Sequence, residues 1–308
     1  MNKRFAVLDL GTNTFHLLIV EESSAGFTEI VHEQDSVKLG EGGINKGFIL
    51  PAAFERGIKT MEWFSELIAQ NKVKQARAIA TSALRNAANG QDFIVEVKAK
   101  TGISIEIVDG DAEAAFIYQG IKAAGCLSAQ NSLIVDIGGG SVEFIICNAS
   151  GIFWKRSFEI GAARLMDRFH RSDPIPPESI SALNLYLEDC LQSLFDAAKA
   201  HPIEDIIGSS GVFESYAEVI ERLKGNAFDL KKTKDYEFKQ DELLDLIEKI
   251  VLSSHQQRVA TAGIIPIRID MIVTASLLTR FIVNKLGISK VTMSTSSLKE
   301  GVLAEMRS

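Results

Sequence analysis

Two short stretches place an acidic residue beside a run of glycine and hydroxyl residues within an otherwise apolar segment. They are "FAVLDLGTNTFHLLIV" at residues 5–20 and "LIVDIGGGSVEFII" at residues 133–146. A single offset of 127 residues superimposes the acid, the glycine and the hydroxyl residue of the two stretches: Asp9 on Asp136, Gly11 on Gly138, and Thr14 on Ser141. A repeated acid at this spacing is typical of a site that was duplicated together with its surroundings.

Both polar segments lie between apolar runs, which predicts a tight turn between two strands. Glycine lets the chain bend and lets an oxyanion approach the backbone closely, while exposed amide N–H groups and hydroxyls donate hydrogen bonds. The turns are therefore predicted to bind phosphate. The residues that would do so are Gly11, Thr12, Asn13, Thr14, Gly138, Gly139, Gly140 and Ser141.

A carboxylate beside such a turn would repel a bare phosphate. Asp9 and Asp136 are expected there if a hard cation lies between carboxylate and phosphate, so the sequence predicts Mg²⁺, or Mn²⁺, as a cofactor. Either turn alone could be an ordinary hairpin, because glycine and asparagine are common turn residues. Two matched copies favour the functional interpretation.

Both halves of the chain show the same succession of elements. Apolar runs predict three strands, then a helix, a strand, a helix, a strand and a helix in each half, with extra helices in the second. The predicted fold is α/β, with two copies of one supersecondary unit. The boundaries are 1–125 and 126–308, and the sequence leaves open whether the last helix packs on the first domain. Residues 223–241 are predicted to form a surface excursion.

The composition supports two globular domains. The chain has 308 residues, of which 46% are hydrophobic and 24% charged, and its net charge is −7. A negative net charge argues against wholesale binding of nucleic acid or an anionic membrane. Three cysteines without metal or redox spacing favour a reduced compartment, and no apolar run is long enough to span a bilayer. We expect a cytoplasmic protein.

The chain resembles the exopolyphosphatase and guanosine pentaphosphate phosphohydrolase (Ppx/GppA) family of the actin, sugar-kinase and heat-shock-chaperone superfamily. Matching stretches span nearly the whole sequence in the family's order. Besides the two turns they are "KLGEGG", "ATSALRNAANG", "IEIVDGDAEAAFIYQGI", "FEIGAARL", "GSSGVFES" and "SLKEGVL". The resemblance implies two duplicated ribonuclease-H-like domains of actin-like type, with a cleft between them in which the phosphate chain binds.

Glu113 is the expected catalytic base by this resemblance. The family motif Gly-x-Glu-Glu-Ala matches "GDAEA", and Glu113 occupies the position of the second glutamate, which acts on water. Position alone does not decide the role, because an acid in the first turn of a helix is favoured by the helix dipole. The first glutamate of the motif is Ala112 here, a departure that bears on the level of activity.

Several further residues are candidates for binding phosphate. Arg85 follows a predicted strand, where its guanidinium could bind phosphate with two hydrogen bonds. Lys38 in "KLGEGG" and Arg164 in "GAARL" are weaker candidates. The "GSSG" turn ends a strand and begins a helix, which favours anions. Its candidate residues are Gly208, Ser209 and Gly211.

The expected function is an enzyme that hydrolyses terminal phosphoanhydride bonds of polyphosphate or guanosine pentaphosphate. An ATP-dependent sugar or acetate kinase is disfavoured because the chain has little inserted sequence for a second substrate. A non-catalytic sensor of polyphosphate or nucleotide stays open because of Ala112. No nucleic-acid or membrane partner is expected, and the sequence leaves a homodimer open.

Overall fold

The computed structural model describes residues 3–24 and 26–307. The chain divides into two compact units, Met1–Gly120 together with Leu298–Ser308, and Ile121–Ser297. The boundary predicted after residue 125 falls just C-terminal to this division, and the last helix belongs to the first unit. In the described part of the chain, no helix is long and apolar enough to cross a membrane.

The first unit is built on a five-stranded sheet in the order β3-β2-β1-β4-β5. Strands β1 and β2 form a buried hairpin, β3 lies at an exposed edge, and β4 and β5 run parallel to β1. The strand bounds are β1 Arg4–Leu10, β2 Phe15–Ser23, β3 Gly26–Asp35, β4 Gln75–Ala80 and β5 Ile105–Ile107. The helices are η1 Ile44–Lys46, α1 Pro51–Gln70, α2 Ser82–Asn86, α3 Gly90–Thr101, α4 Gly110–Ala123 and α12 Leu298–Arg307.

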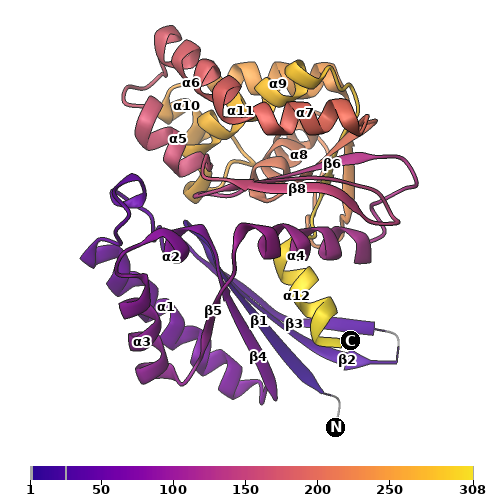
Figure 1. Ribbon diagram of the computed structural model, residues 1–308. Coiled ribbons are helices and arrows are strands. Elements are labelled where there is room, and N and C mark those ends of the chain that lie inside the picture. The colour runs from indigo at the N-terminus through magenta and orange to yellow at the C-terminus, as the bar shows by residue number, and fades with distance from the viewer. Residues whose placement is uncertain (1–2, 25, 308) are drawn as a thin grey trace. The chain divides into compact units, whose positions relative to one another are not determined.

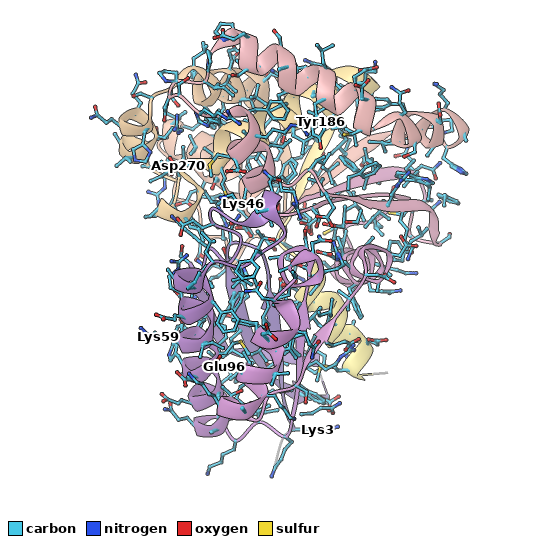
Figure 2. The ribbon with its side chains drawn as sticks, turned by 60° about the vertical axis from the view of Figure 1, so that its left-hand side comes forward. Lys3, Lys46, Lys59, Glu96, Tyr186 and Asp270 are labelled. Carbon is cyan, nitrogen blue, oxygen red and sulfur yellow. The ribbon has the colours of Figure 1, made fainter. Side chains whose placement is uncertain are left out.

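Helices α1 and α3 lie side by side in the first unit (Figure 1). Pro51 begins α1, where its fixed φ favours the helix and its missing N–H leaves no bond unmade. Phe64 of α1 and Phe93 of α3 are fully buried in the core of this unit. Charged residues such as Lys59 and Glu96 project from the outer faces of the two helices (Figure 2), as expected for amphipathic helices.

The second unit is built on a six-stranded sheet in the order β10-β11-β9-β6-β7-β8. Its central strands β6 and β7 are buried at every position. The strands are β6 Ser132–Ile137, β7 Val142–Cys147, β8 Ile152–Phe158, β9 Asp205–Ser209, β10 Asp235–Phe238 and β11 Val291–Ser294. The helices are α5 Ala162–Phe169, α6 Pro177–Cys190, α7 Gln192–Ala200, α8 Gly211–Leu223, α9 Gln240–Leu252, α10 His255–Ala260, η2 Pro266–Arg268 and α11 Met271–Leu286.

The two sheets repeat one topology. Read from β8, the second sheet runs β8-β7-β6-β9-β11, which reproduces the first sheet, β3-β2-β1-β4-β5, strand for strand. The additional strand β10 lies at the far edge, paired antiparallel with β11. Strand β10 lies within residues 223–241, which were predicted to form a surface excursion. Part of that segment therefore extends the sheet. The predicted duplication is therefore present in the strand order.

Candidate active site

The turn after β1 holds its own backbone groups in a fixed arrangement. The amide of Gly11 donates to the carbonyl of Thr14 at 3.1 Å and closes the hairpin. The Thr12 and Asn13 carbonyls accept hydrogen bonds from the amides of Gly40 (3.1 Å) and Lys38 (2.8 Å). Both carbonyls thus face the "KLGEGG" loop. In a planar trans peptide the carbonyl and the following N–H point in opposite directions, so the amides of residues 13 and 14 are directed away from that loop.

The turn after β6 has the same arrangement. The Gly138 amide donates to the Ser141 carbonyl at 3.0 Å. The carbonyls of the three consecutive glycines accept hydrogen bonds from the first amides around α5. These bonds are Ala162 to Gly138 (2.9 Å), Ala163 to Gly139 (2.9 Å) and Gly161 to Gly140 (3.1 Å). By the same peptide geometry, the amides of residues 139, 140 and 141 point away from α5. Successive amides directed to one side form an anion-binding concavity.

Gly161 makes this close approach of backbones possible. A Cβ built on Gly161 would lie 2.4 Å from the carbonyl carbon and oxygen of Gly139. Both contacts are with backbone, which cannot move aside without breaking the three hydrogen bonds. The "FEIGAARL" stretch therefore supports the triple-glycine turn, with a glycine where only a glycine fits.

Comparison of the two turns reveals a relationship that the sequence interpretation missed. Lys38 and Gly40 donate to the first turn as Gly161 and Ala163 donate to the second, and both segments follow the third strand of their sheet. "KLGEGG" and "FEIGAARL" are thus structural counterparts. Their sequences share too little to show this, but their equal position after the third strand was an available signal.

A second acid accompanies Asp136 in the second unit. Glu143 lies directly opposite Asp136 in the antiparallel β6–β7 pair, so the two side chains share one face of the sheet. Their exposed fractions are 8% and 1%, and Ser157 donates to Glu143 Oε1 at 2.6 Å. In the first unit, the position opposite Asp9 is His16. The sequence interpretation missed Glu143 because the sequence alone does not show which residue of the neighbouring strand lies opposite Asp136.

Two facing buried carboxylates suit a hard divalent cation, because oxygen ligands are what Mg²⁺ and Mn²⁺ prefer. The donor set around Asp136 and Glu143 therefore fits the expected metal, while Asp9 supplies one carboxylate beside the turn of the first unit.

Glu113 and Arg85 form a mostly buried ion pair within the first unit. Arg85, at the end of the short helix α2, donates from Nη1 to Glu113 Oε2 at 2.9 Å and to the Val108 carbonyl at 3.1 Å. The side chains are 17% and 8% exposed. Glu113 lies in the first turn of α4, as predicted. The structure thus brings together the two residues predicted as base and phosphate ligand.

Arg164 and the "GSSG" turn also lie around the second turn. Arg164 donates from Nε to the Gly140 carbonyl at 2.8 Å and from Nη2 to Glu159 at 2.9 Å, so its guanidinium supports the turn from the α5 side. Ser210, at the start of α8, donates to the Ile137 carbonyl at 3.0 Å. Ser209 is fully buried and donates to the Ser296 carbonyl at 3.3 Å.

The start of α8 is covered by an arginine. A Cβ on Gly211 would lie 2.0 Å from Nη2 of Arg268, so the guanidinium packs directly on this glycine. Glu214 and Ser215 hold Arg268 there, at 2.8 and 3.1 Å. The predicted anion-binding helix start therefore already faces a positively charged side chain, itself paired with Glu214.

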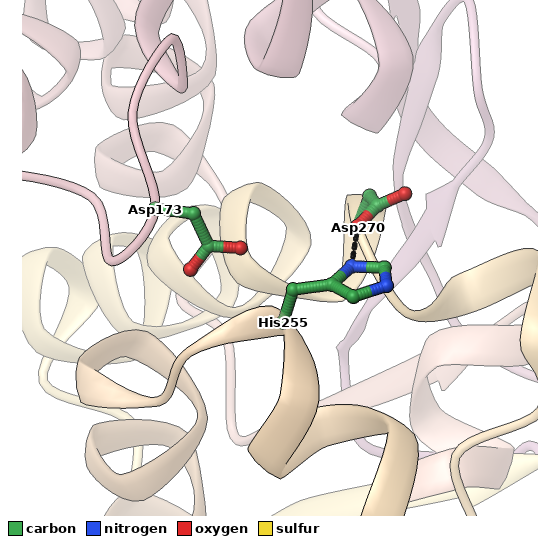
Figure 3. Close-up of side chains that lie close together, drawn as sticks. All are labelled: Asp173, His255 and Asp270. Atoms are coloured by element: carbon green, nitrogen blue, oxygen red, sulfur yellow. Dashed lines mark hydrogen bonds and ion pairs between the residues drawn. The ribbon is translucent and has the colours of Figure 1, made fainter.

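One other group of potential metal ligands lies in the described part of the second unit, formed by Asp173, His255 and Asp270 (Figure 3). His255 Nδ1 is 2.7 Å from Asp270 Oδ1, and all three residues lie toward the surface. Arg258 donates to both carboxylate oxygens of Asp173, at 3.3 and 2.5 Å. Because this guanidinium already neutralises the acids, we assign no metal to the group.

A family model described as the Ppx/GppA phosphatase family matches residues 18–308. An exopolyphosphatase from Cytophaga hutchinsonii is 38% identical, with a TM-score of 0.96 over 99% of this chain and 97% of that chain. A Ppx/GppA enzyme from Aquifex aeolicus is 21% identical, with a TM-score of 0.81 over 99% and 100% of the two chains. An exopolyphosphatase-like protein is 22% identical, with a TM-score of 0.89 over 99% and 98%.

The match to the family model begins after Asp9 and its turn, whereas the structural match to the exopolyphosphatase covers 99% of the chain. The likeness to Ppx/GppA structures also confirms the predicted fold class of two actin-like domains. The chain belongs to the Ppx/GppA phosphatase family.

Proposed function

We propose that this chain is an Mg²⁺-dependent exopolyphosphatase that releases terminal orthophosphate from inorganic polyphosphate. The observation that carries the proposal is the turn at Gly138–Ser141, whose three glycine carbonyls are bonded to the start of α5. Three successive amides are thereby directed to the opposite side, next to the buried acids Asp136 and Glu143. The 38% identity to an exopolyphosphatase supports polyphosphate as the substrate.

In the proposed mechanism the two turns bind phosphate oxygens through their amides and hydroxyls. Asp136 and Glu143 would hold Mg²⁺ in the second unit, and Asp9 is the candidate ligand in the first unit. A bound ion would neutralise charge on the transferring phosphoryl group. Arg85 binds the terminal phosphate, which adds a second positive charge where negative charge gathers.

Glu113 acts on the attacking water. Its carboxylate accepts a proton from the water while the water oxygen forms a bond to the terminal phosphorus. The bridging P–O bond breaks, and the shortened chain leaves with the bridging oxygen and its electron pair. Arg85, bonded to Glu113 at 2.9 Å, also holds that carboxylate in position before the water arrives. Oriented general-base catalysis of this kind typically contributes a factor of about 10² to 10⁴.

The test is release of orthophosphate from polyphosphate and from guanosine pentaphosphate, each with and without Mg²⁺. Mg²⁺-dependent release from polyphosphate is the expected result. Rapid attack on guanosine pentaphosphate without attack on polyphosphate would assign the chain to the other activity of its family. Binding of either compound without phosphate release would identify a sensor. This alternative follows from Ala112, which stands where the family motif has its first glutamate.

A further inference from the structure

Lys38 has an unusual backbone conformation. Its φ is 49°, in the left-handed region, and among the described residues other than glycine only Lys72 and Ser210 also have a positive φ. A side chain with a Cβ is strained in this region, whereas glycine is not. Non-glycine residues held in this way are found mainly where the surroundings fix them and where the side chain has a function.

Backbone hydrogen bonds hold Lys38 in place. Its amide donates to the Asn13 carbonyl at 2.8 Å, and its carbonyl accepts from Arg56 Nη2 at 3.2 Å. Arg56 also donates to the Val37 carbonyl and to Glu41, both at 2.8 Å. None of these bonds uses the lysine side chain. A glycine at position 38 could make the same backbone bonds without strain, so the loop itself does not require lysine.

The ammonium group of Lys38 has no hydrogen bond or ion pair with any residue in the described ranges 3–24 and 26–307. Lys38 is partly buried, and its backbone amide is hydrogen-bonded to the first turn. In that turn the amides of residues 13 and 14 are directed away from the backbone of the loop that carries Lys38. The four-carbon side chain gives the ammonium reach around this turn. A positive charge next to amides that favour anions would increase the affinity of the same anion.

We infer that Lys38 binds the phosphate group held by the turn at Gly11–Thr14, and that this interaction maintains lysine at a strained position. Lys38 would thus be a substrate-binding residue for the proposed hydrolysis of phosphate chains, and the identity of the ligand rests on that proposed function. The anion bound in this way is a phosphate group of the chain.

The direct test is binding of tripolyphosphate without Mg²⁺, measured by calorimetry on the whole chain. Lys38→Met removes the charge and keeps most of the side-chain length, so we expect Kd to rise about tenfold, the loss of one charge-assisted hydrogen bond. In turnover assays with Mg²⁺, KM should rise by a similar factor while kcat changes less than twofold. Lys38→Gly should show the same loss of affinity with a Tm that is unchanged or higher, because the strain is removed.

Lys72→Gly is the matched control. Lys72 also has a left-handed backbone, with φ of 53°, but it is exposed just after the end of α1. Removing its strain should leave or raise Tm without changing Kd or KM. Wild-type affinity in both Lys38 variants would overturn the inference and leave the proposed hydrolysis intact. Weaker binding by Lys38→Met in a protein that releases no phosphate would support the inference and contradict the proposed function.

Discussion

Arg85 Nη1 donates a hydrogen bond to Glu113 Oε2 at 2.9 Å, so the residue predicted to bind phosphate is paired with the residue predicted to activate water. The two are 28 positions apart in sequence and lie on separate helices, α2 and α4. Their pairing makes each residue a structural partner of the other as well as a candidate participant in the reaction.

We expect Arg85→Gln to lower the free energy of unfolding by about 3 kcal/mol, because a buried carboxylate loses its cationic partner. Adding Glu113→Gln should restore a substantial part of this loss, since the remaining buried group is then neutral. Urea unfolding of the two single variants and the double variant measures the coupling. Strictly additive losses would show that the ion pair contributes nothing of its own.

Replacement of one proposed metal ligand should weaken Mg²⁺ binding in a protein that still folds. We expect Asp136→Asn, Asp9→Asn and Glu143→Gln each to raise the Mg²⁺ concentration for half-maximal activity by about tenfold or more, because an amide is a weaker ligand than a carboxylate. Titration of activity with Mg²⁺ measures this. Asp196→Asn, which alters an exposed ion pair on α7, is the control and should leave the titration unchanged.

The surface offers limited means of holding a long polyphosphate. Acidic residues outnumber basic ones by 40 to 33, and Arg164 is already bonded to Glu159 and to Gly140. We expect kcat/KM to rise with chain length only up to about ten phosphates and then to level off. Each further phosphate adds affinity only if it meets a Lys or Arg, and salt screens these contacts. Activity on a ladder of polyphosphate lengths tests this. A continued rise to hundreds of phosphates would reveal a long basic surface.

The extra strand β10 is attached to α8 by a hydrogen-bonded acid. Tyr236 and Asn226 each donate to Glu221 at 2.7 Å, and these bonds lower the pKa of its carboxyl. A lowered pKa in the folded state stabilises the fold above the unfolded pKa of about 4.3, and this stabilisation disappears as pH falls through the lower folded value.

Tyr236→Phe keeps the ring that packs against Phe228 and Phe238 while removing the hydroxyl. It should lower the free energy of unfolding by about 1 kcal/mol at pH 6 and by clearly less near pH 3. Chemical unfolding at the two pH values measures the difference. An equal loss at both would show that the hydroxyl bond is insensitive to the charge of Glu221.

The sequence was sufficient for the fold and for the two glycine-rich turns. The strands on either side of each glycine-rich turn are nearly continuous apolar runs, and the offset between Asp9 and Asp136 reveals the duplication without any structure. Glu113 at the first turn of α4 follows from the same local signals.

The remaining features depend on contacts between segments far apart in sequence. Glu143 gains meaning only from the strand register that places it opposite Asp136. The bonds from Lys38 and Gly161 to the two turns cross 25 and 21 residues, and no local pattern encodes them. Strand β10 was missed because its lysine-rich flanks outweigh four residues of weak strand pattern.

The central claim is that Glu113 activates the attacking water, and turnover of Glu113→Gln under saturating polyphosphate and Mg²⁺ tests it most directly. Glutamine keeps the size and much of the hydrogen bonding but cannot accept the proton, so we predict that kcat falls by about a hundredfold or more in a variant that still folds. Asp111→Asn, which removes the exposed acid of the same helical turn, should retain normal turnover. Near-normal kcat in a folded Glu113→Gln variant would contradict the account.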